Sequence, residues 1–189
     1  MGSVNRTPIG TSSMCNLYSI TKGQQAIRDL AGAMRDLTGN LPMLPGVFPD
    51  YSAPIVRTAA DGVRELSMAR WGMTSPAFAI AGKKTDPGVT NIRNVKSPHW
   101  RRWLGVESRC IVPFTSFAEN EILPDGSRPP VWFAFDDSRP LAFTPASGRA
   151  GRRFGRSGKA RRRTTFSASS RPSPMRSLGR FTRRPCLSF

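Results

Sequence analysis

An α+β fold, built on an antiparallel β-sheet or barrel with a few flanking helices, is predicted by the distribution of apolar residues along the chain. Many short segments alternate apolar and polar positions, as strands with one buried face do. Few segments space their apolar residues as a helix does, and no regular alternation of strand and helix indicates a parallel sheet. With 189 residues, one domain can bury a core without disulfides or metal ions.

The expected elements follow the chain in order. Residues 17–19 predict a strand and residues 24–37 a helix with apolar residues on one face. Residues 42–49 contain three prolines and predict an extended connector. Residues 53–58 and 64–71 predict two strands joined as a hairpin by an Asp-Gly turn. Later strands are expected at 109–117, 131–135 and 141–143, with a short helix at 99–104.

The charge of the chain is distributed unevenly. Its net charge of +17 is typical of a protein that meets a polyanion, most often nucleic acid. From residue 144 onward there are thirteen Lys or Arg residues and no acid, whereas residues 1–143 carry only +4. The last segment is rich in Arg, Ser, Gly and Pro without periodicity, which favours disorder. We therefore expect an N-terminal extension at 1–13, a folded domain at 14–143 and a basic disordered tail at 144–189.

Cysteine usage and hydropathy indicate the compartment. Three cysteines lie far apart and form no CxxC pair, a pattern that fits a reducing cytosol. Residues 1–13 hold no signal-peptide core, and no apolar run is long enough to cross a bilayer. We expect a cytoplasmic monomer that has no membrane contact, no metal and no cofactor.

Cys15 is the first candidate for chemistry, because Met14 directly precedes it. If translation begins at Met14, removal of this methionine leaves Cys15 with a free α-amine and a thiol on adjacent carbons. Such a pair suits an aldehyde: the amine forms a Schiff base, and the thiolate then closes a five-membered thiazolidine ring. An abasic site in DNA presents an aldehyde of this kind. A lone cysteine is otherwise more often a small buried residue.

Four motifs carry a resemblance to a known family. They are MCNLY at 14–18, RWGM at 70–73, TNIRN at 90–94, and RCIVP at 109–113 followed by Glu119. Their order and spacing resemble those of the SOS response-associated peptidase (SRAP) family, over roughly residues 14 to 143. The resemblance implies a SRAP-like fold, incomplete at its C-terminus. It also implies an abasic-site processing protein of the DNA damage (SOS) response, with an associated self-peptidase activity, located at damaged DNA of the nucleoid.

The resemblance also implies roles for individual residues. Cys15 would form the covalent crosslink, and Asn91 and Glu119 would line the pocket around the aldehyde as catalytic residues. Arg93 would hold a phosphate of the single-stranded DNA. Further DNA contacts are expected at Trp71, Arg101 and Arg102.

Each of these residues also has a plainer interpretation. Glu119 would then be a solvated loop acid, Asn91 a turn residue bonded to its own backbone, and Arg93 a surface charge. The four tryptophans would belong to the core rather than stack on bases. Cys110, within an apolar strand, is expected to be inert.

The catalytic histidine of the family belongs to a His-Pro-x-x-Met-Pro motif that this sequence lacks. His99, the single histidine, lies in a segment that matches a non-catalytic part of the family. In the neighbouring reading frame, however, the codons of residues 181–187 can spell Ile-His-Pro-Lys-Ala-Met-Pro. Residues 146–151 and 163–172 can also encode family strands in that frame. We therefore predict a frame slip after about residue 143 and a poorly stable, largely inactive product.

Two other functions stay open. One is a non-catalytic basic nucleic-acid-binding protein whose tail contacts phosphates without sequence preference. The other is a thiol protease that uses Cys15 and His99, for which no third orienting group is evident.

Overall fold

The computed structural model describes residues 17–86, 88–154, 160–169 and 182–184, and beyond residue 148 it gives the course of the backbone alone. Cys15, the first thirteen residues and much of the expected tail lie outside the described residues. The elements, in chain order, are β1 Leu17–Ile20, α1 Gln24–Ala31, β2 Arg35–Asp36, β3 Leu44–Val47, β4 Ser52–Thr58, β5 Arg64–Trp71, α2 Ala77–Ile80, β6 Asn91–Ile92, α3 Pro98–Arg101, the 3₁₀ turn η1 Val106–Ser108, β7 Arg109–Phe114, β8 Ser116–Asn120, β9 Pro130–Ala134, β10 Ala142–Phe154, β11 Ala160–Ser169 and β12 Thr182–Arg184.

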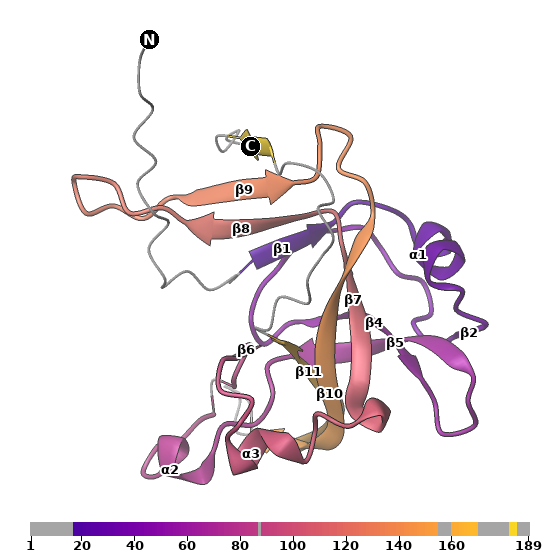
Figure 1. Ribbon diagram of the computed structural model, residues 1–189, viewed down its shortest axis with the longest axis vertical. Helices are drawn as coiled ribbons and strands as arrows, with labels where there is room; N and C mark the ends of the chain where they lie inside the picture. The colour runs from indigo at the N-terminus through magenta and orange to yellow at the C-terminus, as the bar shows by residue number, and fades with distance from the viewer. Residues whose placement is uncertain (1–16, 87, 155–159, 170–181, 185–189) are drawn as a thin grey trace.

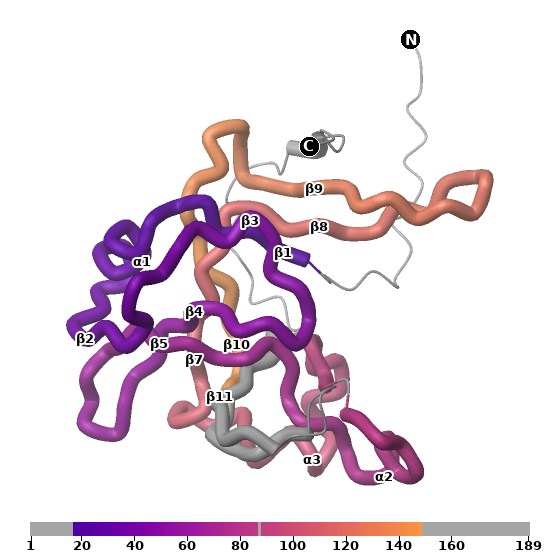
Figure 2. The backbone as a smooth tube through the Cα atoms, turned by 180° about the vertical axis from the view of Figure 1, so that it is seen from behind, coloured from indigo at the N-terminus to yellow at the C-terminus, as the bar shows by residue number. Residues whose placement is uncertain are grey.

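The strands form two sheets. One has the order β12-β9-β8-β1-β3, and the other has the order β2-β5-β4-β7-β10-β11-β6. Strands β9, β8 and β1 lie side by side at the top of Figure 1, and β4, β5, β7 and β10 lie below them. Figure 2 shows the same arrangement from behind, with β3 at the edge of the upper sheet and α3 beneath the lower one. The α+β class built on a mainly antiparallel sheet is confirmed.

The larger sheet closes on itself. β11 pairs with β10 along one edge, and on its other edge Thr165 lies opposite Arg70 and Phe166 opposite Trp71 of β5. Strands β5, β4, β7, β10 and β11 therefore make a closed ring, so of the sheet and the barrel that the sequence left open, the structure has a barrel. Closure removes the free edges that an open sheet would expose.

The main core fills this barrel and the space under α1. Successive residues of a strand point to opposite faces, so alternate positions of β4, β5 and β7 face the interior, and the other face of β5 lies toward α1, where Arg64 donates to the Ala31 carbonyl. Ile55, Ala69 and Cys110 are buried on one side, whereas Leu66 and Ile27 are buried on the other. Both faces of β5 are thus covered.

The two sheets are joined where β7 passes into β8. Thr115, at this junction, donates its backbone N–H to the Ser19 carbonyl of β1 at 2.8 Å. The Ser19 hydroxyl lies 2.8 Å from that of Ser116 and 3.2 Å from that of Thr115, and all three residues are buried. The paired hydroxyls satisfy one another where water is excluded.

The first helix is shorter than the sequence predicted. It was expected over 24–37 but ends at Ala31, because Gly32 adopts a left-handed φ of 60° and its N–H satisfies carbonyls of the last turn. The following residues join the sheet instead: Met34 and Leu37 donate their N–H groups to the carbonyls of Arg64 and Leu66. Met34 and Leu37 have helical spacing in the sequence, but in the structure they lie beside a strand and not in a helix.

Strand β10 continues past residue 143, where the sequence placed the end of the folded domain. Ala146 pairs with Cys110 of β7, and both Ala146 and Ser147 are buried. The small side chain of Ala146 faces the same side of the sheet as Cys110, toward the interior of the barrel, and Ser147 faces the opposite side. The division into extension, partial domain and tail, and the frame slip itself, stay predictions. Within the described residues, no helix is long and apolar enough to span a membrane.

Candidate nucleic-acid interface

The strand that leads back to Cys15 runs beside β8. Leu17 lies opposite Ala118 and Tyr18 opposite Phe117, and Glu119 is the next residue along β8. Cys15 is outside the described residues, but only two peptide units separate it from Leu17, so their Cα atoms are at most about 7–8 Å apart. The region around the start of β1 is therefore where chemistry at Cys15 must take place.

Glu119 lies on the face of β8 that turns toward the barrel. Phe117 and Glu119 are two residues apart and so point to the same side of the sheet. Phe117 packs against the core, and its ring stacks on Phe133 of β9 with centroids 5.4 Å apart. Glu119 is half-buried opposite Val131. A carboxylate at this position is neither fully solvated nor fully enclosed.

Trp71 is a core residue. It is 3% exposed, and its ring meets Tyr18 edge to face at 5.0 Å. Its indole N–H donates to the Thr90 carbonyl at 3.4 Å. Of the two interpretations of Trp71, the structure favours the buried one: the ring is enclosed by the core and offers no face for a base. Its contribution to the site is to hold the backbone next to Asn91.

Asn91 begins the two-residue strand β6 and is half-buried. Its side-chain amide donates to the Thr90 hydroxyl at 3.4 Å, and its backbone lies opposite Ala168 of β11. Ile92, the next residue, is buried against Met73 and Trp100 in a second, smaller core. Asn91 and the first residues of β1 are therefore linked through Thr90, Trp71 and Tyr18.

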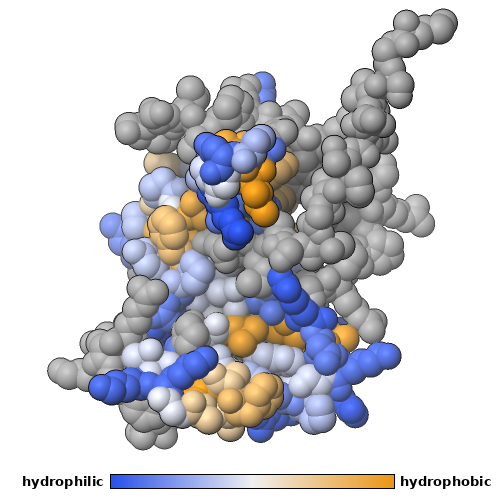
Figure 3. Space-filling model, turned by 90° about the vertical axis from the view of Figure 1, so that its left-hand side faces the viewer, coloured by the Kyte–Doolittle hydropathy of each residue, from blue (hydrophilic) through white to orange (hydrophobic). Residues whose placement is uncertain are grey.

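Exposed basic residues lie on both sides of Asn91 along the chain. Arg93, Arg101 and Arg102 are exposed, as the sequence predicted for DNA contacts. The structure adds three exposed lysines that the sequence analysis missed, Lys83, Lys84 and Lys96. Asp86, the acid among them, is buried and accepts hydrogen bonds from Ser75 and Gly88. Figure 3 shows hydrophilic side chains around a small apolar area on the lower part of the side that carries β6 and α2 in Figure 1.

An exposed aromatic ring lies within the same stretch of chain. Phe78 of α2 is 84% exposed, although a phenylalanine usually packs in a core. It lies between the buried Met73 and the exposed Lys83 in sequence. No motif in the sequence identified Phe78, and only its exposure in the structure singles it out.

The helix α3 is anchored by aromatic packing. The His99 ring lies edge to face against Trp100 at 4.4 Å and Trp103 at 5.1 Å, and its Nε2 is 3.0 Å from the Thr74 carbonyl. Because a carbonyl can only accept, Nε2 carries the proton. The Arg102 guanidinium lies 4.1 Å above the Trp103 ring. His99 thus supports the segment that carries Arg101 and Arg102, an arrangement that suits the non-catalytic role expected of this histidine.

Cys110 lies inside the barrel. It is buried, and burial raises the pKa of its thiol to about 12, although the charge of Arg57 opposes this shift. Burial also raises the pKa of the Tyr18 hydroxyl, with a further contribution from Cys110. A thiol that stays protonated is a poor nucleophile, which agrees with the expected inert role of Cys110.

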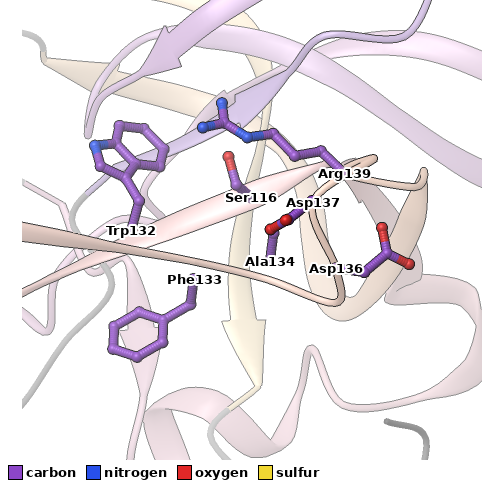
Figure 4. Close-up of a pocket in the computed structure, with 7 residues that line it drawn as sticks. All are labelled: Ser116, Trp132, Phe133, Ala134, Asp136, Asp137 and Arg139. Atoms are coloured by element: carbon purple, nitrogen blue, oxygen red, sulfur yellow. The ribbon is translucent and has the colours of Figure 1, made fainter. Parts of the chain in front are cut away.

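A shallow pocket lies at the other end of the β8–β9 pair. Figure 4 shows the seven residues that line it, with the Arg139 side chain passing above Ser116 toward Trp132. Asp136 and Asp137 form its outer rim, on the turn after β9. None of the residues predicted for the site lines this pocket. In the described part of the chain, no group of three or more His, Cys, Asp or Glu residues is placed to hold a metal ion.

Comparison with known proteins identifies relatives of the chain. A model of the family described as SOS response associated peptidase (SRAP) matches residues 14–156, which include all four motifs. A protein from Bordetella bronchiseptica has a similar structure, with a TM-score of 0.57, 19% identity and coverage of 90% of this chain and 82% of that one. No curated protein matches the chain.

Two further solved structures are similar. A phage-related protein from Bordetella bronchiseptica has a TM-score of 0.59 at 14% identity. The match covers 82% of this chain and 68% of that protein. A protein from Bacteroides thetaiotaomicron has a TM-score of 0.57 at 19% identity, with 82% of this chain and 67% of that chain covered. At these identities the likeness is one of fold.

Proposed function

Because the chain belongs to the SOS response associated peptidase family, we propose that it captures abasic sites in single-stranded DNA through Cys15. The family gives the chain a role in the SOS response to DNA damage. The observation that carries the finer proposal is the continuous path of contacts from the start of β1 through Trp71 to Asn91, with exposed cations directly beyond it.

The exposed cations favour a nucleic-acid backbone as the partner. Lys83, Lys84 and Arg93 flank the segment that carries Asn91, and the acid within that segment is buried and hydrogen-bonded. Phosphates that replace counterions on such a surface contribute most of the affinity for a single strand. Phe78 of α2, which precedes Lys83 in the chain, offers a ring face to an unstacked base.

The trapping reaction joins one aldehyde to one residue. The α-amine of Cys15 adds to the aldehyde carbon of the opened abasic sugar, and the resulting carbinolamine loses water to give a Schiff base. The thiolate then attacks the same carbon, and the proton it has given up ends on the nitrogen. The product is a five-membered thiazolidine, and water is the only molecule released.

Glu119 and Asn91 take complementary roles in this proposal. A carboxyl group close to the start of β1 can donate the proton with which the hydroxyl of the carbinolamine leaves as water. Half-burial of Glu119 suits such a donor, because the group keeps contact with solvent and with the reacting atoms. The amide of Asn91 would hold an oxygen of the sugar, and Arg93 would hold the neighbouring phosphate.

The chemistry requires a free amine at Cys15, so residues 1–14 must be absent from the active form. Translation that begins at Met14, followed by removal of this methionine, would give that form. Self-processing by the peptidase activity of the family would also give it. The His-Pro-x-x-Met-Pro motif is missing from this sequence, so we propose trapping as the principal activity and a weak peptidase activity.

The test is a denaturing gel of the protein that begins at Cys15 with a single-stranded oligonucleotide carrying an abasic site. A covalent adduct is expected, with a mass equal to the sum of the two partners minus one water. Cys15→Ala should remove the adduct, and Cys110→Ala should retain it, since Cys110 is buried. An oligonucleotide with a tetrahydrofuran in place of the sugar aldehyde should give none. Equal adduct formation by Cys15→Ala would refute the role of Cys15.

The non-catalytic basic binder remains the second candidate, and the thirteen basic residues after residue 143 favour it. It predicts reversible binding that added salt abolishes, equal affinity for intact and abasic strands, and no adduct from the wild-type protein. The same gel, together with a filter-binding titration in increasing salt, separates the two functions.

A further inference from the structure

The turn between β3 and β4 presents two aromatic rings to solvent. Phe48 and Tyr51 are 46% and 57% exposed, their ring centroids are 5.6 Å apart, and their planes are inclined by 59°. Because the planes are tilted, neither ring covers the face of the other, and a third flat group can stack on them. Adjacent exposed aromatic side chains on a folded domain commonly mark a binding surface.

The turn that carries these rings is strained and firmly held. Asp50, between them, has a φ of 79°, a left-handed conformation in which residues other than glycine are uncommon. The Arg70 guanidinium pairs with the Asp50 carboxylate, and its Nε donates to the Asp50 carbonyl at 3.1 Å. Strained backbone that its surroundings impose in this way clusters at sites of function.

Backbone hydrogen bonds attach the same turn to the end of β5. The Asp50 N–H donates to the Trp71 carbonyl at 2.9 Å, and the Trp71 N–H donates to the Tyr51 carbonyl at 2.9 Å. Trp71 is the residue whose indole bonds to the Thr90 carbonyl. Tyr51 is therefore separated from the segment that carries Asn91 and Arg93 by a single buried residue.

On its other side the turn touches the start of β1. A Cβ atom at Gly46 would lie 3.4 Å from a ring carbon of Phe48 and 3.5 Å from a methyl carbon of Leu17. The Phe48 ring and the Leu17 side chain therefore both lie beside Gly46, whose missing side chain leaves them room. Leu17 is the second residue after Cys15. The aromatic pair thus lies between the strand that leads back to Cys15 and the segment that carries Asn91.

We infer that Phe48 and Tyr51 form the stacking site for the nucleobase that adjoins the abasic position in single-stranded DNA. This inference rests on the proposed function and deepens it. The occupant is a base, because the adjoining segment carries Arg93 and two exposed lysines that attract a phosphate backbone. Every base has a flat π face, so the site accepts any sequence beside the lesion.

Stacking at this position would serve the trapping reaction. An abasic nucleotide has no base of its own to be held, so its sugar is free to move. If the neighbouring base is fixed on a rigid aromatic pair, the aldehyde is held at a constant distance from the start of β1. Orientation of this kind raises the rate of the step that joins the two groups.

The experiment measures the environment of the neighbouring base directly. A single-stranded oligonucleotide carries a tetrahydrofuran at the abasic position, which prevents crosslinking, and a 2-aminopurine on one side or the other. The wild-type protein should change the fluorescence of the 2-aminopurine on one side. Phe48→Ala and Tyr51→Ala should lose this change and bind about tenfold more weakly. Tyr51→Leu keeps an apolar side chain without a flat ring and should behave like Tyr51→Ala.

Leu30→Ala is the matched control, because Leu30 is also exposed and lies on α1. It should leave both fluorescence and affinity unchanged. Wild-type affinity and fluorescence in all three ring variants, from a protein that still forms the abasic adduct, would overturn this inference and leave the proposed function standing. A change of oligomeric state in Tyr51→Ala with unchanged DNA affinity would also overturn it. Failure of the wild-type protein to bind any single strand would overturn both.

Discussion

The rings of Tyr18 and Trp71 meet edge to face in the core, with centroids 5.0 Å apart and planes inclined by 70°. Tyr18 belongs to the strand that leads back to Cys15, and Trp71 holds the Thr90 carbonyl beside Asn91. One buried aromatic contact therefore fixes the positions of two elements that are far apart in sequence. A site assembled on such a contact is held by the core of the protein rather than by its loops.

Replacement of Phe78 tests the exposed ring of α2. Phe78→Ala should weaken binding of an intact single strand about tenfold, because base stacking on the ring is lost. The melting temperature should stay unchanged, since the side chain is 84% exposed. Fluorescence anisotropy with a labelled oligonucleotide measures the affinity. Met34→Ala, at another exposed apolar residue, serves as the control, and equal affinity of both variants would exclude a stacking role for Phe78.

Arg93 is expected to contact one phosphate. Arg93→Gln should reduce the affinity for single strands of any sequence by a similar factor and should lower the salt slope by about 0.7, the value for one contact on a single strand. Binding titrations at several salt concentrations give this slope. Lys22→Gln removes one exposed charge beyond the opposite end of β1 and should leave the slope unchanged. A slope that is the same in Arg93→Gln and in the wild type would remove Arg93 from the interface.

Replacement of Glu65 tests the ion pairs that this buried residue forms with Arg35 and Arg57. Glu65 is 2% exposed and accepts from Arg57 at 2.8 Å and from Arg35 at 3.3 Å. Glu65→Ala should lower the free energy of unfolding by about 1–3 kcal/mol, because it removes the charge-assisted hydrogen bonds of a buried carboxylate, whereas Arg57 and Arg35, 37% and 39% exposed, keep contact with solvent. Asp61→Ala removes the exposed partner of Arg35 and should cost less than about 1 kcal/mol. Denaturant unfolding measures both, and similar losses would show that burial of Glu65 is unimportant.

The buried thiol of Cys110 predicts a dependence of stability on pH. Burial raises its pKa from 9.0 to about 12. The unfolded protein therefore loses the thiol proton before the folded protein does, and this contribution to stability is complete below pH 9 and is lost as the pH rises toward 12. Cys110→Ala should flatten the decline over this range, measured by urea unfolding at successive pH values. A decline of the same steepness in both proteins would contradict the raised pKa.

Much of the barrel could be predicted from local patterns. The β4–β5 hairpin follows from alternating apolar residues on either side of an Asp-Gly turn, in which Gly62 has a φ of 80°. β7 and β9 follow from short apolar runs. The strands β2, β3 and β6 could not be predicted in the same way, because each is short and is defined by its partner rather than by its own residues. β3 lies in the segment that its prolines marked as a connector.

The candidate site, like the fold, could be predicted from the sequence only in part. Asn91 and Glu119 were identified because their motifs occur in the order of the family, and both are half-buried. Glu119 lies near the start of β1, and Asn91 is linked to β1 through Thr90 and the contact of Trp71 with Tyr18. Phe78, Lys83 and Lys84 belong to no motif, and only their exposure in the folded chain makes them candidates. The role of Trp71 could not be decided from sequence, since a core ring and a stacking ring have the same local pattern.

Closure of the barrel has a consequence for synthesis on the ribosome. β5 ends at Trp71, but β11, the strand that seals the ring against it, begins only at Ala160. At about 5–20 residues per second, the hairpin of β4 and β5 waits on the order of ten seconds for that partner. During this interval its apolar face is open to other nascent chains, so the yield of native protein should depend on holdase chaperones more strongly than its modest size suggests.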